Sequence, residues 1–534
     1  MRHHTSLEAA TSAFVGAAMD GVRGLLPSVA GLEWDNGFTP VALAGRSVSD
    51  RAESVFNAAM AVRTSDDPAD GTYLLRGTLA DPAAADKLRG HEGVVGVFSD
   101  PEIAPCITCG GSSPLGTAAD VEALLCTSRM QTRGCAMDGR GVLMAIVDTG
   151  INLKYLQSTG KNPTIDSGHS WTPDPSLIPF ELPVGHGTMC AFDALIAAPR
   201  CTLLDIAVLQ STKTGPTVMS GVLSDAVLAY NHLIKLLQNA PRGRPFSLVV
   251  SNSWGMFHPS WDFPKGDPGN YSHNPNHPFN RIVGDLERAG ADILFAAGNC
   301  GPECPDGRCQ GVTTKTITGA NSHPAVLTVA GVDITKTRVG YSSVGPGALT
   351  RYKPDISGYT HFSGSGVWPA DSGTSAATPV VAGVIAAVRS KRPFSPTNPT
   401  SSPAAIRALV TSNAQDLGSQ GYDYAYGYGV IDSCRLVTHF RCRKQVLNPV
   451  CEECRRRCAD LGSAPIPNPY CRRCQKLCPD QGNTAARSDV DHQDPEQAEP
   501  GAAGSPGHGD SAIPGLTAEE IAYLRGMIGG LRMR

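Results

Sequence analysis

Apolar residues in the middle of the chain fall into short unbroken runs that alternate with longer stretches of helical periodicity. Such runs are typical of buried strands. Strands are expected at residues 142–147, 203–209, 246–254 and 291–299, and helices are expected to begin near residues 186, 221 and 375. Because strands that alternate with helices build a parallel sheet covered by helices, the pattern predicts an α/β fold.

Polar residues follow the ends of these elements. Asp148, Ser253 and Asn299 stand at the carboxyl ends of predicted strands, where an open α/β sheet holds its ligand. His186 and Ser375 each stand at the start of a predicted apolar helix. The unpaired N–H groups and partial positive charge of a helix N-terminus suit the oxyanion that forms when a hydroxyl attacks a carbonyl.

Each residue also has an ordinary structural interpretation, since Ser and Asp are common caps and a lone His is often structural. In the chain order Asp148, His186, Ser375, however, the three match one known order of the hydrolytic Asp-His-Ser triad. The serine motif differs from the G-x-S-x-G elbow, because Ala377 stands where the second glycine would be. An α/β-hydrolase fold is therefore disfavoured.

The segments around these residues resemble the signatures of the subtilase family of serine endopeptidases. The similar segments are VDTG at 147–150, GHGT at 185–188, SGTSAATP at 372–379, FAAGN at 295–299, SNSWG at 251–255, KPDIS at 353–357 and YGYGVID at 426–432. The resemblance covers residues 138–436. Ala376 and Val380 depart from it, since the family often has Met and His there, but neither position is catalytic.

The resemblance implies a subtilisin-like parallel sheet with helices on both faces. It also implies a serine endopeptidase that works through an acyl-enzyme intermediate, with Ser375 as nucleophile and His186 as general base. Asp148 would hold the imidazole, and Asn299 would be the oxyanion-hole donor.

Ser253, Trp254 and Gly255 correspond to the substrate-binding strand of the family. Substrates are expected to be proteins or peptides, and no cofactor is expected to be required for catalysis. Structural calcium, frequent in the family, has no readable site. Two alternatives stay open: a maturation protease dedicated to one peptide, and a catalytically silent peptide-binding scaffold on the same fold.

Residues 1–105 precede the catalytic region. The first 60 residues are Ala-rich and are expected to be helical. A strand, a helix and a strand are then expected at residues 73–79, 82–88 and 94–98. The segment of about residues 70–103 resembles the end of the inhibitory propeptide of the family, and the alternative is a permanent accessory domain.

Residues 106–137 are turn-rich and are expected to form a linker with a short helix at 118–125. Because proteolysis concentrates in exposed linkers, any autoprocessing is expected between Cys106 and Arg140.

The 17 cysteines include three directly after the predicted oxyanion residue, Cys300, Cys304 and Cys309. A disulfide, a set of thiolate metal ligands and a plain surface loop are all open for them, and Cys190 or Cys201 is a candidate partner for the odd cysteine. A nearby Pro- and Gly-rich loop carries three histidines that are expected to face solvent rather than a metal: His258, His273 and His277.

The C-terminal part contains a Cys-rich repeat module at residues 437–480, a linker at 481–515 expected to be disordered, and an amphipathic helix at 516–534. The repeat has the spacing of a four-thiolate zinc site, with the candidate ligands Cys451, Cys454, Cys471 and Cys474. Three disulfides are the alternative, because each repeat has one further cysteine. The terminal helix is expected to dock on its own domain or on a partner.

Composition limits the remaining functions. The net charge of −4 argues against binding of nucleic acid, and no apolar run reaches the roughly 18 residues of a membrane-spanning helix. Glu8 and Asp20 interrupt the N-terminal stretch, so a secretion signal is not expected. This favours the cytoplasm, while the number of cysteines leaves the compartment open.

Overall fold

The computed structural model describes residues 32–43, 72–79, 83–91, 94–105, 113–132, 134–211, 221–239 and 247–440. The chain divides into two compact units, residues 1–445 and residues 446–534. The second unit lies outside the described residues. The same holds for most of the predicted N-terminal helical region and for the four cysteines with zinc spacing, Cys451, Cys454, Cys471 and Cys474.

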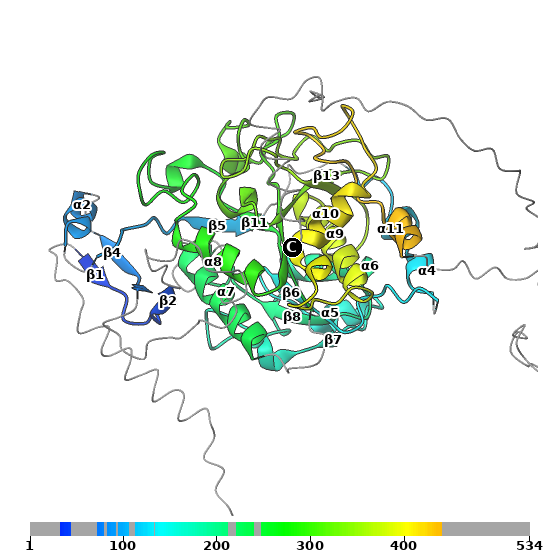
Figure 1. The fold of residues 1–534 in the computed structure, drawn as a ribbon, viewed down its shortest axis with the longest axis horizontal. Coiled ribbons are helices and arrows are strands. Elements are labelled where there is room, and N and C mark those ends of the chain that lie inside the picture. The colour runs from blue at the N-terminus through cyan, green and yellow to red at the C-terminus, as the bar shows by residue number, and fades with distance from the viewer. Residues whose placement is uncertain are drawn as a thin grey trace, which may run out of the picture. The chain divides into compact units, whose positions relative to one another are not determined.

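A seven-stranded sheet forms the centre of the first unit, in the order β14-β13-β12-β10-β6-β8-β7 (Figure 1). All its strand pairs are parallel. The strands are β6 (Val142–Val147), β7 (Thr164–Ile165), β8 (Thr202–Ile206), β10 (Ser247–Asn252), β12 (Ala291–Ala296), β13 (Leu327–Val332) and β14 (Ile356–Tyr359). Strands β10, β12 and β13 are buried along their whole length. Burial on both faces explains why the sequence shows unbroken apolar runs there.

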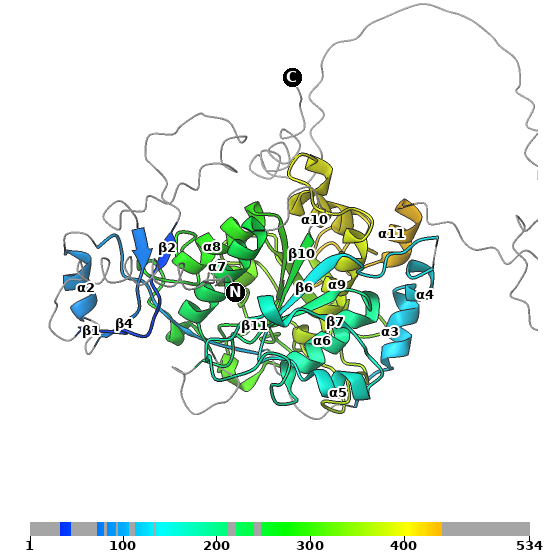
Figure 2. The same cartoon turned by 90° about the horizontal axis from the view of Figure 1, so that it is seen from below.

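Helices cover both faces of this sheet, as predicted. Helices α6 (His186–Ala197) and α9 (Thr374–Arg389) pack against each other on one face, and α7 (Leu223–Gln238) and α8 (Pro278–Arg288) pack against each other on the other (Figures 1 and 2). Shorter helices are α5 (Leu153–Ser158), α10 (Pro403–Ser412) and α11 (Ser433–His439).

The central strand β6 shows how the two cores are divided. Met144 and Ile146 belong to the core beneath α6 and α9, whereas Ala145 and Val147 belong to the core beneath α7 and α8. Successive side chains of a strand point to opposite faces, so the same six residues anchor both layers. The residue that follows β6 is thereby held at the middle of the sheet.

The N-terminal part contains short antiparallel strands. Strand β1 (Leu32–Trp34) pairs with β4 (Gly77–Leu79), β2 (Val41–Leu43) pairs with β3 (Thr72–Leu74), and α2 spans Ala83–Arg89. The prediction of helix for the first 60 residues is therefore wrong for 32–43, where each short strand gains a partner that is distant in sequence. The single strand predicted at 73–79 is two strands, because each half pairs with a different partner.

The strand predicted at residues 94–98 is also wrong, since this segment has no strand partner. Instead, β5 (Glu102–Pro105) pairs antiparallel with β9 (Gly221–Val222) and β11 (Trp254–Gly255). Both partners of β5 lie in the catalytic region, more than a hundred residues away. Local periodicity could not show this pairing.

Part of the predicted linker at 106–137 is packed structure. Residues 118–124 form α3 (Ala118–Leu124) and residues 127–130 form α4 (Thr127–Met130). Val121, Leu125 and Met130 are buried in the core beneath α6 and α9. A disulfide joins Cys126 to Cys434 on α11.

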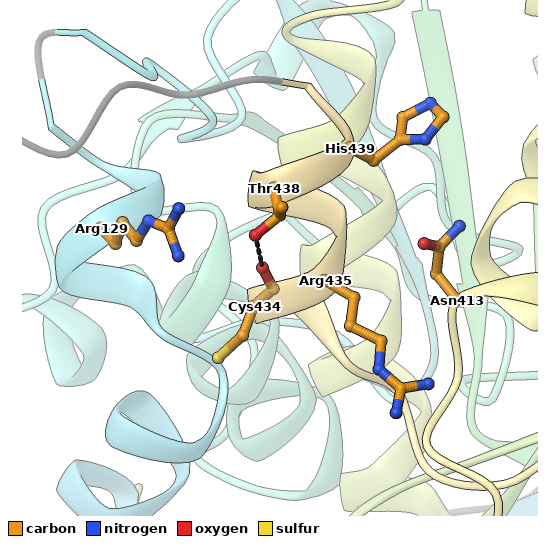
Figure 3. Close-up of a pocket in the computed structure, with 6 residues that line it drawn as sticks. All are labelled: Arg129, Asn413, Cys434, Arg435, Thr438 and His439. Carbon is orange, nitrogen blue, oxygen red and sulfur yellow. Dashed lines mark hydrogen bonds between the residues drawn. The ribbon is translucent and has the colours of Figure 1, made fainter. Parts of the chain in front are cut away.

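Beside this disulfide lies a cavity of about 540 Å³. Its lining residues are Arg129, Asn413, Cys434, Arg435, Thr438 and His439 (Figure 3). No member of the predicted triad lines this pocket. Within the described part of the chain, no helix combines the length and hydrophobicity needed to cross a membrane.

Candidate active site

The end of β6 and the start of α6 bring Asp148 and His186 together. His186 Nδ1 lies 2.7 Å from Asp148 Oδ1, and the two side chains are only 2% and 1% exposed. The backbone N–H of Thr149 also donates to Asp148 Oδ1, at 2.7 Å. Because a carboxylate accepts, Nδ1 carries the proton and Nε2 is left as the basic nitrogen.

A glycine makes this approach of helix and strand possible. A Cβ atom at Gly187 would lie 2.5 Å from the carbonyl oxygen of Gly150, which is backbone and cannot move aside. The N–H of Gly187 instead donates to Thr149 Oγ1 at 2.9 Å. The GHGT and VDTG segments therefore fit together through direct contact of their backbones.

Ser375 lies in the first turn of α9, fully buried. Its Oγ donates to the carbonyl of Ser253 at 3.1 Å, and Ser253 Oγ donates to the carbonyl of Ser375 at 3.0 Å. His186 Nε2 is buried and has no hydrogen-bond partner among the described residues. The base of the predicted triad is thus available to accept a proton.

Cys190 contacts all three members of the predicted triad, although it was not predicted to lie at the active site. Its Sγ lies 3.7 Å from Asp148 Oδ2, 3.7 Å from His186 Nδ1 and 3.6 Å from the carbonyl oxygen of Ser375. Residues four apart lie on the same face of a helix, so the spacing of Cys190 from His186 could have indicated that their side chains lie close together. Burial, followed by the charge of Asp148, raises the pKa of the thiol well above its usual range.

Asp148, His186 and Cys190 are also the one group of three His, Cys, Asp or Glu side chains within 4.8 Å in the described part of the chain. They are a poor fit for a resident metal, because Nδ1 is already bonded to the carboxylate and the thiol is held protonated. A metal would have to displace both protons.

The loop histidines do not form such a group. His258 Nδ1 bonds Ser260 Oγ at 2.7 Å, and His277 Nε2 donates to the carbonyl of Ser99 at 3.0 Å. Burial lowers the pKa of His277 to about 4. His277 is buried rather than solvent-facing, so the expectation was wrong for this residue.

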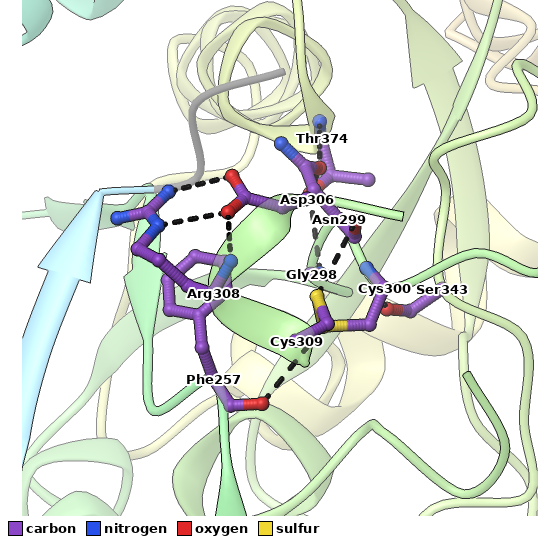
Figure 4. The surroundings of a disulfide bond; sticks show 9 residues. All are labelled: Phe257, Gly298, Asn299, Cys300, Asp306, Arg308, Cys309, Ser343 and Thr374. Atoms are coloured by element: carbon purple, nitrogen blue, oxygen red, sulfur yellow. Dashed lines mark hydrogen bonds and ion pairs between the residues drawn. A yellow bond between two sulfur atoms is a disulfide. The ribbon is translucent and has the colours of Figure 1, made fainter. Parts of the chain in front are cut away.

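Asn299 follows β12 and is oriented by the residue before Ser375 (Figure 4). Its Oδ1 accepts from Thr374 N at 3.0 Å and from Thr374 Oγ1 at 2.9 Å. The N–H of Gly298 donates to the same Thr374 hydroxyl at 3.1 Å. With Oδ1 engaged twice, the amide plane is fixed and the Nδ2 donor has a defined direction.

A disulfide closes the loop that follows Asn299. Cys300 is bonded to Cys309, and the carbonyl of Asn299 accepts from Asp306 N at 2.8 Å inside this loop (Figure 4). Arg308 pairs with Asp306 and stacks 3.8 Å from the centre of the Phe257 ring. Of the three options left open for these cysteines, the structure has the disulfide.

Cys304 is also disulfide-bonded. Cys190 and Cys201, the candidates for pairing with this cluster, are free and buried. That suggestion is therefore wrong, because both thiols lie in the core beneath α6 and α9.

The predicted substrate-binding strand, β11, is paired with another strand of the same chain, β5. Trp254 is paired with Pro105 and Gly255 with Ala104, in an antiparallel register. The Trp254 side chain is fully buried against Phe295, so this residue offers its backbone, and not its side chain, to the paired strand. This arrangement resembles the addition of an extended peptide to a sheet edge.

Two buried carboxyl groups lie between α6 and the segment before Ser375. They belong to Asp193 and Asp371. Asp193 lies on α6 and is fully buried, and neither of its oxygens meets a donor among the described residues. Burial, followed by the charge of Asp371, raises the pKa of Asp193 well above its usual range. Burial also raises the pKa of Asp371. Because the charge of Asp371 acts on Asp193, the two carboxyl groups lie close together, and both are easier to protonate than exposed carboxyl groups.

This pair predicts an alkaline loss of stability. A carboxyl with a raised folded-state pKa stabilises the fold below the unfolded pKa of about 4, and this contribution is lost as pH rises through the folded pKa. Asp193→Asn keeps the size of the side chain and removes one of the two groups that must stay protonated in the folded chain. We expect its free energy of unfolding to exceed that of the wild type by about 1 kcal/mol or more at pH 8 and to approach it at pH 4.

Urea unfolding of both proteins across this pH range checks the expectation, with Asp86→Asn as the control because that carboxyl is exposed. Parallel pH profiles of wild type and Asp193→Asn would contradict the raised pKa of Asp193.

Comparison with known proteins identifies the family of this chain. The model of the subtilase family matches residues 139–429. Serine protease AprX of Bacillus subtilis (strain 168) is 27% identical over 337 residues, covering 56% of this chain and 67% of that protein. Subtilisin DY of Bacillus licheniformis is 27% identical over 317 residues, covering 58% and 94%.

Among solved structures, the S41 psychrophilic protease covers 55% of this chain and 92% of its own, with a TM-score of 0.41 and 21% identity. Sphericase is similar, at a TM-score of 0.39 and 20% identity. The family model spans more than half of the 534 residues, and the chain therefore belongs to the subtilase family.

Proposed function

We propose that this protein is a serine endopeptidase that uses Asp148, His186 and Ser375 as its catalytic triad. The observation that carries the proposal is the buried 2.7 Å contact between Asp148 and His186 Nδ1, with His186 Nε2 unpartnered among the described residues. This arrangement fixes the tautomer in which Nε2 is the base.

The reaction begins when Ser375 Oγ leaves the carbonyl of Ser253 and donates to His186 Nε2. His186 takes the proton as Oγ attacks the peptide carbonyl, and Asp148 stabilises the imidazolium that forms. His186 then gives the proton to the leaving amine, and an acyl-enzyme remains on Ser375. A water molecule, deprotonated by Nε2 in the same way, hydrolyses this ester.

The negative charge on the tetrahedral oxygen needs donors. Asn299 Nδ2 supports this role because Thr374 holds the other end of the amide. The N–H of Ser375, in the first turn of α9, is the second donor. Both donors are held in place before substrate binds, so little reorganisation is needed during the reaction.

We further propose that the N-terminal region inhibits the enzyme until it is cleaved. Strand β5 occupies the substrate-binding edge, and side chains anchor the region around it. Arg76 Nη1 bonds Asp225 at 2.8 Å, and Asp100 accepts from the N–H and the hydroxyl of Ser224, each at 2.7 Å. Arg89 bonds Asp267 at 2.6 Å.

Self-cleavage is proposed within residues 106–112. This interval follows β5, whose last residue lies opposite Trp254, next to Ser253 and hence to Ser375. The next residues are unsuitable for cleavage, because 113–132 is anchored by α3, α4 and the Cys126–Cys434 disulfide. The interval for self-cleavage that was predicted from the sequence, residues 106–140, is therefore narrowed to residues 106–112.

Labelling with a fluorophosphonate tests the triad. After removal of the N-terminal region, the wild type should gain one probe per chain and hydrolyse peptides, whereas Ser375→Ala should do neither. Ser412→Ala, on the outer helix α10, is the control and should label like the wild type. Wild-type protein that binds peptides but neither labels nor hydrolyses would support a silent scaffold instead.

Asn299→Ala tests the oxyanion donor. The loss of one such donor in a subtilisin lowers kcat by about 10²–10³-fold, and we expect a similar loss here with KM nearly unchanged. The thermal unfolding midpoint of the variant is measured alongside, because Asn299 also bonds Thr374. A loss confined to KM would assign Asn299 to ground-state binding rather than to the transition state.

A further inference from the structure

The path of the chain identifies the two sides of the cleft. On one side, β5 lies along β11 and approaches Ser375 through Ser253. On the other side, the chain is described again from residue 113 and follows residues 361–363. Leu115 N donates to the His361 carbonyl at 2.8 Å, and Ala118 N donates to the Ser363 carbonyl at 2.8 Å.

Residues 113–118 come directly after the interval in which we propose cleavage, and they lie along residues 361–363. If a substrate follows the same path as the chain, the residues after its cleaved bond lie toward the hairpin formed by residues 361–371. This hairpin marks the side of the leaving group, which carries the residues after the cleaved bond.

Trp368 lies on this hairpin and points an exposed aromatic ring at the triad. The centre of its ring is 6.1 Å from the centre of the His186 ring, and the side chain is 36% exposed. Val184, two residues before His186, is also exposed, at 45%. Large apolar side chains that stay exposed beside a reactive group indicate a surface that binds something apolar.

Hydrogen bonds close the hairpin that carries Trp368. Its strands are joined by Asp371 N to the Phe362 carbonyl at 2.8 Å, and by His361 N to the Asp371 carbonyl at 2.7 Å. The Asp371 carboxylate accepts from both the N–H and the hydroxyl of Ser365, each at 2.5 Å. A side chain presented by a braced hairpin loses little entropy when it binds a ligand.

We propose that Trp368 determines specificity by contacting an apolar side chain in the first two residues after the cleaved bond. The inference rests on the proposed function and names a class of substrate for the same site. The contact acts before the leaving amine takes its proton from His186 and departs, so it affects acylation only. Substrates without residues on the leaving side do not use it.

The test compares three substrates that share the residues before the cleaved bond, taken from a peptide that the wild type is first shown to cleave. Two are internally quenched peptides with Leu-Leu or Ser-Ser after the bond, and the third is a methyl ester, whose leaving group, methanol, carries no apolar side chain. The full chain is used after its own activation. The variants are Trp368→Ala, Trp368→Phe and the control Tyr428→Ala, an aromatic residue of similar exposure.

We expect the wild type to favour Leu-Leu over Ser-Ser by about tenfold in kcat/KM, and Trp368→Ala to lose this preference. Trp368→Phe should retain most of it, and Tyr428→Ala all of it. Hydrolysis of the methyl ester should stay within about twofold of the wild type in every variant, which also shows that the triad is intact.

Two results would overturn the inference while leaving the proposed function in place. One is an unchanged Leu-Leu preference in Trp368→Ala. The other is an equal loss on all three substrates, which would mean that Trp368 only supports His186. A wild type that cleaves no peptide would refute the proposed function itself, and the inference with it.

Discussion

The buried contact between Asp148 and His186 is the interaction on which the rest of the site depends. The carboxylate and the imidazole come from a strand and a helix that are 38 residues apart, and they meet with Nδ1 and Oδ1 at 2.7 Å. Burial makes this pair costly unless both groups are bonded. The bond between them satisfies both groups, and it forms because β6 is fixed between β10 and β8. Asp148, which follows β6, is thereby held at a defined position at the middle of the sheet. Ser375 and Asn299 are then arranged around a fixed imidazole.

A second constraint is the open edge of β11, which needs partners for its backbone. Strand β5 supplies them, and the same backbone groups would bind an extended substrate. One edge would therefore serve both the proposed binding of substrate and its proposed closure by the N-terminal region. The contacts of Arg76 and Asp100 with the start of α7 add to this closure without touching the triad.

Much of the catalytic core could be predicted from the sequence, because β6, β10 and β12 are apolar runs that end on polar residues. The contacts between these strands and segments distant in sequence could be predicted only in part. The placement of β5 required knowledge of pairings over more than a hundred residues, and the cysteine pairs depend on backbone approach that spacing does not reveal. The contact of Cys190 with His186 could have been predicted from their spacing of four residues on one helix, whereas Trp368 was missed because it reaches His186 only in the folded chain.

Intact-mass measurement of the full chain under reducing conditions tests the central claim most directly. It compares wild type with Ser375→Ala after the same incubation. The account predicts that the wild type separates into two pieces broken within residues 106–112, while Ser375→Ala stays whole. A wild type that stays whole while its serine reacts with a fluorophosphonate, or a variant cut at the same bond, would contradict self-processing by this triad.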